Sequence, residues 1–459
     1  MQHLAPVWRQ AARYVAMVSL AVPTLVAGSQ VAQGSGFALR EQSATAMGNA
    51  FAGATAAAED VSYMFFNPAG LTRHSGNQAS LSVTYIAPRS ELEGASASTV
   101  LGGSLSGSTT RDDIGVNGVL PANYGFFDLH PDFKAAIALN VPFGLETDYE
   151  DDWVGRYHAL NSKLLTVDVN PTVAYRVNDW LSLGAGVQVN YIDVSLTNAV
   201  DFGTIAFAQT VGAVGVPGQQ DGEAKVEGDD VGFGYTFGAL VEPLPGTRFG
   251  VGYRSKIEHE VEGEAKFLLD GSGTAAILQG LATPSPFVDT GAAVTATLPE
   301  TASFGVYHEL DDQWAVMGEA AWTRWSQFYE LRIRFDNPGQ PDNFTETSYN
   351  NTWFFAVGAT YRWTDNWTFR VGAAYDESPI PDETRTPRIP DEDRYWTSLG
   401  AAYTPFPELT VNLSYTHIFV DDPTINLSTG GTGNTFRGNL AAEYNGSVDL
   451  FGLQATYRF

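Results

Sequence analysis

The chain ends in DLFGLQATYRF (residues 449–459), where apolar side chains occupy every second position. These side chains are Phe451, Leu453, Ala455, Tyr457 and Phe459. The same alternation recurs in segments 165–175, 181–191, 367–376 and 409–415. Successive side chains of a β-strand point to opposite faces, so a period of two predicts strands with one apolar and one polar face.

Short and long connections alternate between the predicted strands. The short ones lie at Leu129, Arg176, Pro243, Leu310, Trp363 and Pro405, and the long ones begin near Arg89, Glu146, Asp201, Lys266, Asp336, Ser378 and Asp421. This layout gives about 14 strands, with short turns at one end and long loops at the other, which is typical of outer-membrane barrels. We therefore predict an all-β membrane protein, an antiparallel transmembrane β-barrel over residues 77–459. A soluble β-sandwich would expose the aromatic face of the last strand or need a second sheet to cover it.

The last strand is expected to pair with the first, which begins near Gln78, and so to close the barrel. Its aromatic side chains would lie in the headgroup girdle, where amphipathic rings are favoured. A terminal aromatic strand also resembles the signal that the bacterial barrel-assembly machinery reads. The predicted location is the outer membrane of a Gram-negative bacterium, with the lipid bilayer and its lipopolysaccharide as surroundings.

The N-terminus has the layout of an export signal. Arg9 and Arg13 precede an apolar run from residue 14 to 27, and small residues follow it up to Gly34. The run is shorter than the ~20 residues that a spanning helix needs, and it contains Pro23. We expect residues 1–34 to be a signal peptide.

Composition excludes several classes of function. The chain has no cysteine, which rules out disulfides and zinc–thiolate sites. Its net charge of −27 argues against nucleic acid as a partner. The histidines accompany neither a Gly-x-Ser-x-Gly elbow nor a metal-spaced cluster, so no catalytic residue, metal site or cofactor is predicted.

Residues 35–76 do not fit the strand pattern. The segment is rich in Ala, Gly and Ser, but it also carries Phe37, Leu39, Phe51, Tyr63, Phe65 and Phe66. This apolar content is too high for a disordered tail. Since a barrel this wide would otherwise hold an open aqueous channel, we predict an N-terminal hatch, or plug, in the lumen.

Several motifs resemble the FadL family of outer-membrane transporters for hydrophobic compounds. They are NPAG at 67–70 after a segment beginning GFAL, PFGL at 142–145, WVGRY at 153–157, WSQF at 325–328 and the long block DNWTFRVGAAYDESPIPDETRTPRIPDEDRYW at 365–396. The resemblance covers essentially the whole mature chain. It implies a 14-stranded barrel with an N-terminal hatch. It also implies uptake of long-chain fatty acids or related hydrocarbons, with capture at an outer site and lateral exit near a kinked strand as the hatch moves.

Two predicted long loops are unusually apolar for segments that face water. They supply the candidate substrate-binding residues Phe202, Phe207, Phe267, Leu268, Ile277 and Leu278. The loops could form amphipathic helices that pack on each other as a lid, or they could hold an apolar tail between them. For a carboxylate head group, a cation beside an apolar pocket is needed. Arg332 and Arg334 in LRIRF are candidates, together with lumen-facing Arg370.

Asn67, Pro68 and Ala69 are expected to form the turn that ends the hatch before the first strand. Prolines inside strands remove ladder bonds and can open the pairing locally. Pro121 and Pro142 are therefore the candidates for an opening in the wall.

The sequence thus predicts a transporter that takes up fatty acids, alkanes or aromatics, acting as a monomer. A general porin is the alternative, although a plug and apolar loops count against it. An outer-membrane lipase or deacylase is less favoured.

Overall fold

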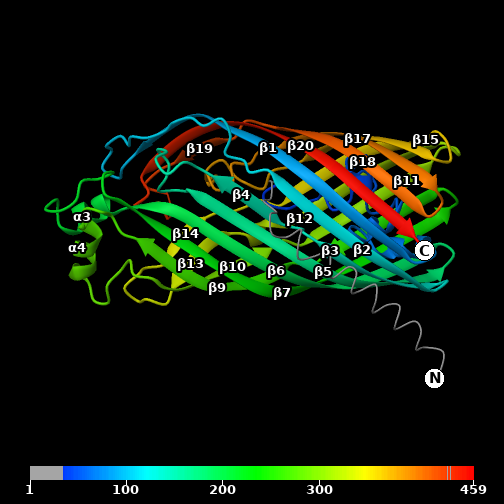
Figure 1. Ribbon diagram of the computed structural model, residues 1–459, viewed down its shortest axis with the longest axis horizontal. Coiled ribbons are helices and arrows are strands. Elements are labelled where there is room, and N and C mark those ends of the chain that lie inside the picture. Colours follow the sequence, from blue (N-terminus) through cyan, green and yellow to red (C-terminus); the bar gives the residue numbers. More distant parts are fainter. Residues whose placement is uncertain (1–34, 432, 435) are drawn as a thin grey trace, which may run out of the picture.

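The computed structural model describes residues 35–431, 433–434 and 436–459. The predicted signal peptide, residues 1–34, lies outside the described residues. Within the described part of the chain, fourteen antiparallel strands pair in a closed ring (Figure 1). The ring runs in the order β1, β2, β3, β5, β6, β7, β8, β11, β12, β15, β16, β17, β18, β20 and back to β1. This confirms the predicted transmembrane barrel.

The strands of the ring have the following bounds: β1 Gln78–Ser98, β2 Gly118–His130, β3 Phe133–Asn140, β5 Asn161–Asn178, β6 Leu181–Asp201, β7 Asp221–Leu244, β8 Thr247–Arg254, β11 Thr301–Glu309, β12 Trp314–Thr323, β15 Thr352–Arg362, β16 Trp367–Asp376, β17 Arg394–Phe406, β18 Leu409–Val420 and β20 Asn439–Arg458. The six predicted short turns each separate two consecutive strands of this ring.

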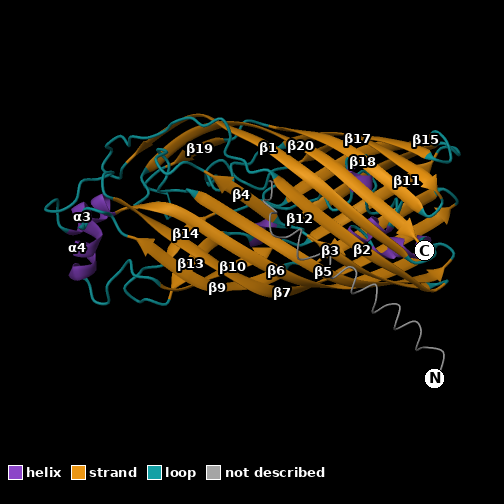
Figure 2. Ribbon diagram, viewed as in Figure 1, coloured by secondary structure: helices purple, strands orange, loops and turns teal. Residues whose placement is uncertain are grey.

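Further strands extend the wall at the long-loop end (Figure 2). They are β4 Gly144–Asp148, β9 Ile257–Leu268, β10 Thr290–Leu298, β13 Glu330–Phe335, β14 Asn343–Glu346 and β19 Thr424–Leu427. β4 pairs with β5, and β19 pairs with β20. β9 pairs with the first residues of β7, β10 pairs with β9, β13 with β10, and β14 with β13.

The first and last strands close the barrel, as the sequence predicts. β1 and β20 pair from Gln78↔Arg458 to Ser98↔Asn439. On β20 the outward side chains of Phe451 and Leu453 are each 51% exposed, whereas the inward Leu450 and Gln454 are fully buried. An apolar face that stays exposed in the folded chain is what a lipid-facing wall requires.

Residues 35–76 lie inside the ring of strands (Figure 1). The segment contains the short helix α2 Ala44–Met47 and two 3-10 helices, η2 Val61–Phe65 and η3 Pro68–Arg73. From residue 35 to 72, all residues except Ala38, Arg40, Glu59 and Asp60 are buried. We call residues 35–76 the N-terminal segment.

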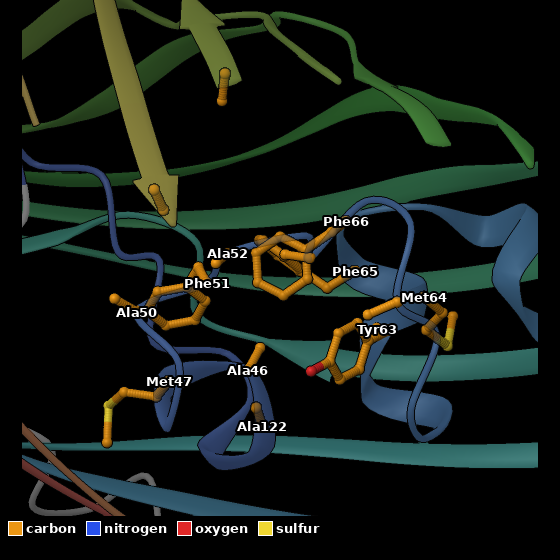
Figure 3. Close-up of a cluster of buried hydrophobic side chains, with 14 of the residues drawn as sticks. Ala46, Met47, Ala50, Phe51, Ala52, Tyr63, Met64, Phe65, Phe66 and Ala122 are labelled. Carbon is orange, nitrogen blue, oxygen red and sulfur yellow. The ribbon is translucent and has the colours of Figure 1, made fainter. Parts of the chain in front are cut away.

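A hydrophobic cluster joins this segment to the inward faces of the strands. Figure 3 shows Met47, Phe51, Tyr63 and Phe66 of the segment packed together, with Ala122 of β2 beside them. This core is therefore built jointly by the N-terminal segment and the inward side chains of the strands.

Two helices lie beyond the extended wall, at the tip of the long loops (Figure 2). They are α3 Phe202–Gln209 and α4 Thr274–Leu281, and a third short element, η4 Trp325–Gln327, interrupts the wall between β12 and β13. Among the described residues, no helix is both long and apolar enough to cross a bilayer.

Candidate functional site

The wall has a break in its hydrogen-bond ladder between β2 and β3. Pairing of these strands ends at Asn123↔Leu139, and the chain re-enters the wall at Gly144, where β4 pairs with β5. Among the described residues, 118–122 of β2 therefore have ladder partners on β1 only. The residues between β3 and β4 are Val141–Phe143, and proline is favoured at such interruptions because it has no N–H to donate.

The two prolines predicted at a wall opening lie on the two edges of this break. Pro121 is on β2, opposite Val83 of β1 and two residues beyond the last β2–β3 pair. Pro142 lies between β3 and β4. The structure thus places both residues at one interruption of the wall, and their role in opening it stays a prediction.

The N-terminal segment lies against the break and forms backbone hydrogen bonds with the chain between β3 and β4. The backbone N–H of Leu39 donates to the carbonyl of Pro142 at 2.8 Å, and the N–H of Gly144 donates to the carbonyl of Phe37 at 2.9 Å. Buried backbone groups need such partners, so the segment satisfies groups that the ladder leaves unpaired.

The side chain of Gln42 completes this seal. Its amide nitrogen donates to the carbonyl of Val141 at 2.6 Å, and its amide oxygen accepts from the N–H of Val141 at 3.2 Å. The hydroxyl of Tyr124 on β2 donates to the Gln42 carbonyl at 2.7 Å. Gln42 is fully buried. Since water cannot reach its polar groups, they depend on these hydrogen bonds.

A second cluster of apolar side chains lies at the level where β9, β10 and β13 extend the wall, and we call it the apolar compartment. Its buried members are Phe37, Leu145, Ile192, Ile257, Val261, Ala265, Ala292, Val294, Leu298, Trp325, Phe328, Ile333, Tyr349, Ile380 and Ile389. Phe37 is the contribution of the N-terminal segment. Its ring centroid lies 4.7 Å from that of Trp325, 5.3 Å from Phe328 and 5.9 Å from Phe143.

A cavity of about 90 Å³ lies between the apolar compartment and the N-terminal segment. Its lining includes Leu39, Phe143 and Trp325, together with the polar side chains of Arg40 and Asp376. Ligand pockets usually measure roughly 300–1,000 Å³, so this cavity is too small for a long hydrocarbon. The Phe37 ring lies against two of the lining residues, Phe143 and Trp325.

Asn67, Pro68 and Ala69 anchor the N-terminal segment at the start of η3. The Asn67 side chain accepts from the N–H of Ala69 at 3.0 Å and donates to the carbonyls of Thr55 at 2.7 Å and Ala239 at 2.9 Å. Pro68 occupies the first helical turn, where its missing N–H costs nothing. The predicted turn is therefore a capped helix start that is also tied to β7.

The predicted loop residues fall on and around α3 and α4. Phe202 and Leu278 are fully buried between the two helices, whereas Ile277 is 46% and Leu268 is 68% exposed. Phe207 is partly buried. The helices thus pack on each other in this structure, which is the lid-like arrangement that the sequence left open, and they leave apolar side chains at their surface.

Phe267 connects these helices to the apolar compartment. Its ring lies 5.8 Å from that of Phe287 in the α4 loop and 6.2 Å from that of Phe335 at the end of β13. A continuous series of apolar contacts therefore leads from the loop tip into the barrel.

Arg332 and Arg334 lie on the outer face of β13, away from the apolar compartment. Ile333 between them is the side chain that enters it. Arg332 pairs with Glu330 at 2.6 Å, and Arg334 approaches Glu260 at 3.4 Å. Both arginines line a polar pocket of about 230 Å³ whose lining also includes Phe328 of the apolar compartment, and their role in binding a head group stays a prediction.

Sequence reasoning did not single out Gln42, Arg40 or Trp325 as site residues. Phe37 and Trp325 lie within the motifs GFAL and WSQF, and this was the signal that could have identified them. Nothing in the sequence around Gln42 indicates that its amide pairs with a strand interruption a hundred residues away. Among the described residues, no group of three or more His, Asp or Glu side chains is arranged to hold a metal ion.

Comparisons with known proteins agree with this architecture. The chain is 28% identical over 460 residues to the long-chain fatty acid transport protein of Escherichia coli K12, covering 96% of this chain and 98% of that protein. The corresponding protein of Salmonella typhi is 28% identical over 449 residues, again covering 96% and 98%. The crystal structure of a Pseudomonas aeruginosa FadL homologue superposes with a TM-score of 0.86 at 28% identity, covering 92% of this chain and all of that one.

The model of one protein family matches almost the whole chain, from residue 25 to 459. Its match and the barrel fold together place the protein in the outer membrane. The chain belongs to the outer membrane protein transport protein family (OMPP1/FadL/TodX).

Proposed function

We propose that this protein takes up hydrophobic small molecules, fatty acids, alkanes or aromatics, across the outer membrane and releases them sideways into the bilayer. The relatives named above are fatty acid transport proteins, and the family is one of transport proteins. A substrate would be captured at the exposed apolar surface of α3 and α4. It would then pass along Phe267 into the apolar compartment and leave through the break between β2 and β3.

The observation that carries this proposal is that one segment does two things. Phe37 packs in the apolar compartment, and the backbone of Phe37 and Leu39 is hydrogen-bonded to the chain at the break in the wall. A substrate that displaces Phe37 would therefore also loosen the seal. The N-terminal segment acts in this proposal as a hatch, and Asn67–Ala69 is the fixed end about which it moves.

The surroundings follow from the same proposal. The protein would work as a monomer, since each barrel holds its own compartment and break. It would be inserted by the barrel-assembly machinery into a bilayer whose outer leaflet is lipopolysaccharide. No enzymatic step is part of the proposed route.

A reversible tether tests the hatch. Ala38 and Phe143 form an isolated antiparallel bridge, and such partners have Cα atoms about 4.5–5.5 Å apart, which a disulfide can span. Because the chain has no cysteine of its own, the double variant Ala38→Cys/Phe143→Cys carries only the intended pair. Oxidised, it should lose uptake of labelled oleate and of an alkane into liposomes, and a reductant should restore both.

The two single-cysteine variants serve as matched controls and should transport under both conditions. Uptake that survives full oxidation of the pair would overturn the moving-hatch route. Planar-bilayer recordings separate the transporter from a porin, because a steady large conductance in the unmodified protein would favour the porin.

A further inference from the structure

The lipid-facing side of the wall carries a groove of about 860 Å³, which we call the outer groove. It runs over β12, β15, β16, β17, β18 and β20, on the far side of β1 from the break between β2 and β3. Its lining is mainly apolar and includes the aromatic rings of Trp314, Tyr361 and Phe369. The outside of a closed barrel is convex, so a hollow of this size needs a local cause.

Two alanines on the outer face produce the hollow. Ala401 of β17 lies directly opposite Phe369 of β16 and Leu413 of β18. Ala359 of β15 lies opposite Val371 of β16. Directly opposite residues share one face of a sheet, and Phe369, Val371 and Leu413 are all exposed on it. Small side chains among large ones therefore leave a gap in the apolar surface.

The floor of the outer groove is supported from inside the barrel. Gly400 and Gly452 belong to its lining. On the inner side, a Cβ atom on Gly400 would lie 2.7 Å from Cα of Gly48, and one on Gly452 would lie 2.7 Å from Cε of Met47. The N-terminal segment thus packs directly against the backbone of the wall here. Because its floor cannot collapse inward, the groove is a preformed site, as ligand pockets usually are.

The outer groove spans about one leaflet of the bilayer. Trp314 and Tyr361 lie at the short-turn end of their strands, with ring centroids 4.6 Å apart. Short turns face the periplasm, and aromatic rings mark the membrane interface. Leu413 is the fifth residue of β18 and Leu453 the sixth from the end of β20, which carries the C-terminus at the same end (Figure 1). At roughly 3.3 Å per residue and a tilt of roughly 40°, they lie ~10–13 Å above that end, about halfway up a ~25 Å apolar band.

We infer that the outer groove binds one acyl chain of a phospholipid from the periplasmic leaflet. The protein lies in the outer membrane, so what meets this face is the bilayer, and an acyl chain matches the apolar lining. Lipopolysaccharide enters from the opposite end of the wall. The wall of a second barrel is convex and would leave the floor uncovered. The phospholipid head lies beside Trp314 and Tyr361, where amphipathic rings are favoured. The site is independent of the proposed route of uptake.

The test fills the groove with a larger side chain. Full-length protein is reconstituted in vesicles of phosphatidylethanolamine, phosphatidylglycerol and lipopolysaccharide, extracted gently, and its bound lipids are counted by native mass spectrometry. The unmodified protein should retain one phospholipid per barrel. Ala401→Leu and Ala359→Leu should each lose it, because the added side chain occupies the space of the acyl chain. Migration as a folded species in unheated gels identifies the variants whose barrel is intact.

Ala185→Leu is the matched control. Ala185 lies on the outer face of β6 between Val173 and Phe237, and it is not part of the groove lining. This variant should retain phospholipid like the unmodified protein.

Four results would overturn the site. They are full retention in both folded groove variants, an equal loss in Ala185→Leu, retention of lipopolysaccharide in place of phospholipid, and a dimer mass that disappears in Ala401→Leu. The last result would assign the groove to a second copy of the chain.

Discussion

At the scale of single residues, the N-terminal segment packs very closely against glycines of the wall. A Cβ atom on Gly238 would lie 2.0 Å from Oδ1 of Asn67 and 2.7 Å from Cδ of Pro68. On Gly184 it would lie 2.5 Å from the backbone nitrogen of Ala69. Only glycine allows so close an approach, because it has no Cβ atom. Gly184 and Gly238 therefore determine how closely η3 packs against β6 and β7.

Gly238→Ala should therefore push Asn67 out of place. The hydrogen bond from Asn67 to Ala239 should be lost, and the segment should loosen because each such buried bond contributes about 1 kcal/mol net. We expect ion conductance in planar bilayers to rise from near zero to frequent openings. Gly94→Ala is the control, since a Cβ there would meet no atom within 4 Å. Identical conductance of the two variants would contradict the prediction.

The residue scale is also where the sequence was least informative. Asn67, Pro68 and Ala69 were predicted from their motif, and Pro121 and Pro142 as prolines inside strands. Pro121 does lie in β2, whereas Pro142 lies between β3 and β4, outside both strands. The Asn67 and Gln42 side chains bind backbone carbonyl and N–H groups, and no side-chain pattern reveals a backbone partner far along the chain. For the head-group candidates Arg332 and Arg334, the sequence could not show on which face of their strand they would lie.

At the scale of elements, β13 reverses the rule that holds for the membrane-spanning strands. Within the bilayer the outer face is apolar, as Phe451 and Leu453 of β20 show. β13 extends the wall toward the long loops, so its outer face carries the ion-paired arginines and its apolar Ile333 points inward. Alternation predicted the strand correctly, but it could not tell which face was inner, because that depends on the height of the strand relative to the lipid.

The breaks in the strands could not be predicted for a related reason. Alternation continues past Ser255 and Lys256, where β8 passes into β9, although the pairing partner changes from β11 to β10. Register is a property of two strands, and one strand's pattern does not contain it. The break at Pro142 could be predicted because proline itself disturbs the ladder.

The α4 helix should respond to acid through Asp270. Its carboxylate accepts from the N–H groups of Thr274 at 3.0 Å and Ala275 at 2.6 Å. Burial raises the pKa of Asp270, but the bond from the Ser272 hydroxyl and these N–H bonds outweigh it and lower the pKa below 3.8. A lowered pKa means that the charged form stabilises the folded loop, fully above pH 3.8 and progressively less as the pH falls through the lowered value.

Asp270→Asn should accordingly destabilise α4 locally by about 1 kcal/mol at pH 7. Hydrogen–deuterium exchange of residues 274–281 should accelerate about fivefold, while the barrel strands keep their protection. After correction for intrinsic rates, the difference between variant and unmodified protein should shrink near pH 3. A variant that exchanges like the unmodified protein at pH 7 would show that Asp270 does not hold the helix.

At the scale of the whole molecule, the barrel wall and the N-terminal segment inside it can be tested separately. The strands close on themselves through β1 and β20, so the wall does not need the N-terminal segment to complete its ring. Deleting residues 37–73 while keeping the export signal should give a barrel that still migrates as a folded species in unheated gels. It should conduct ions steadily, because a barrel of this strand number without a plug encloses an aqueous channel.

Full-length protein recorded in parallel is the reference, and it should show no steady conductance. A folded deletion variant that also fails to conduct would mean that the long loops, rather than the N-terminal segment, obstruct the lumen.

The seal at the β2–β3 break and the obstruction in the lumen are one continuous stretch of backbone. A cell envelope must admit nutrients without becoming leaky to other solutes. Two independent gates could fail separately, and each failure would admit whatever fits. In the proposed route the same residues would close the side exit and occupy the interior. Only a solute that competes for the apolar contacts of the segment would then open the exit, and selectivity would need no separate filter.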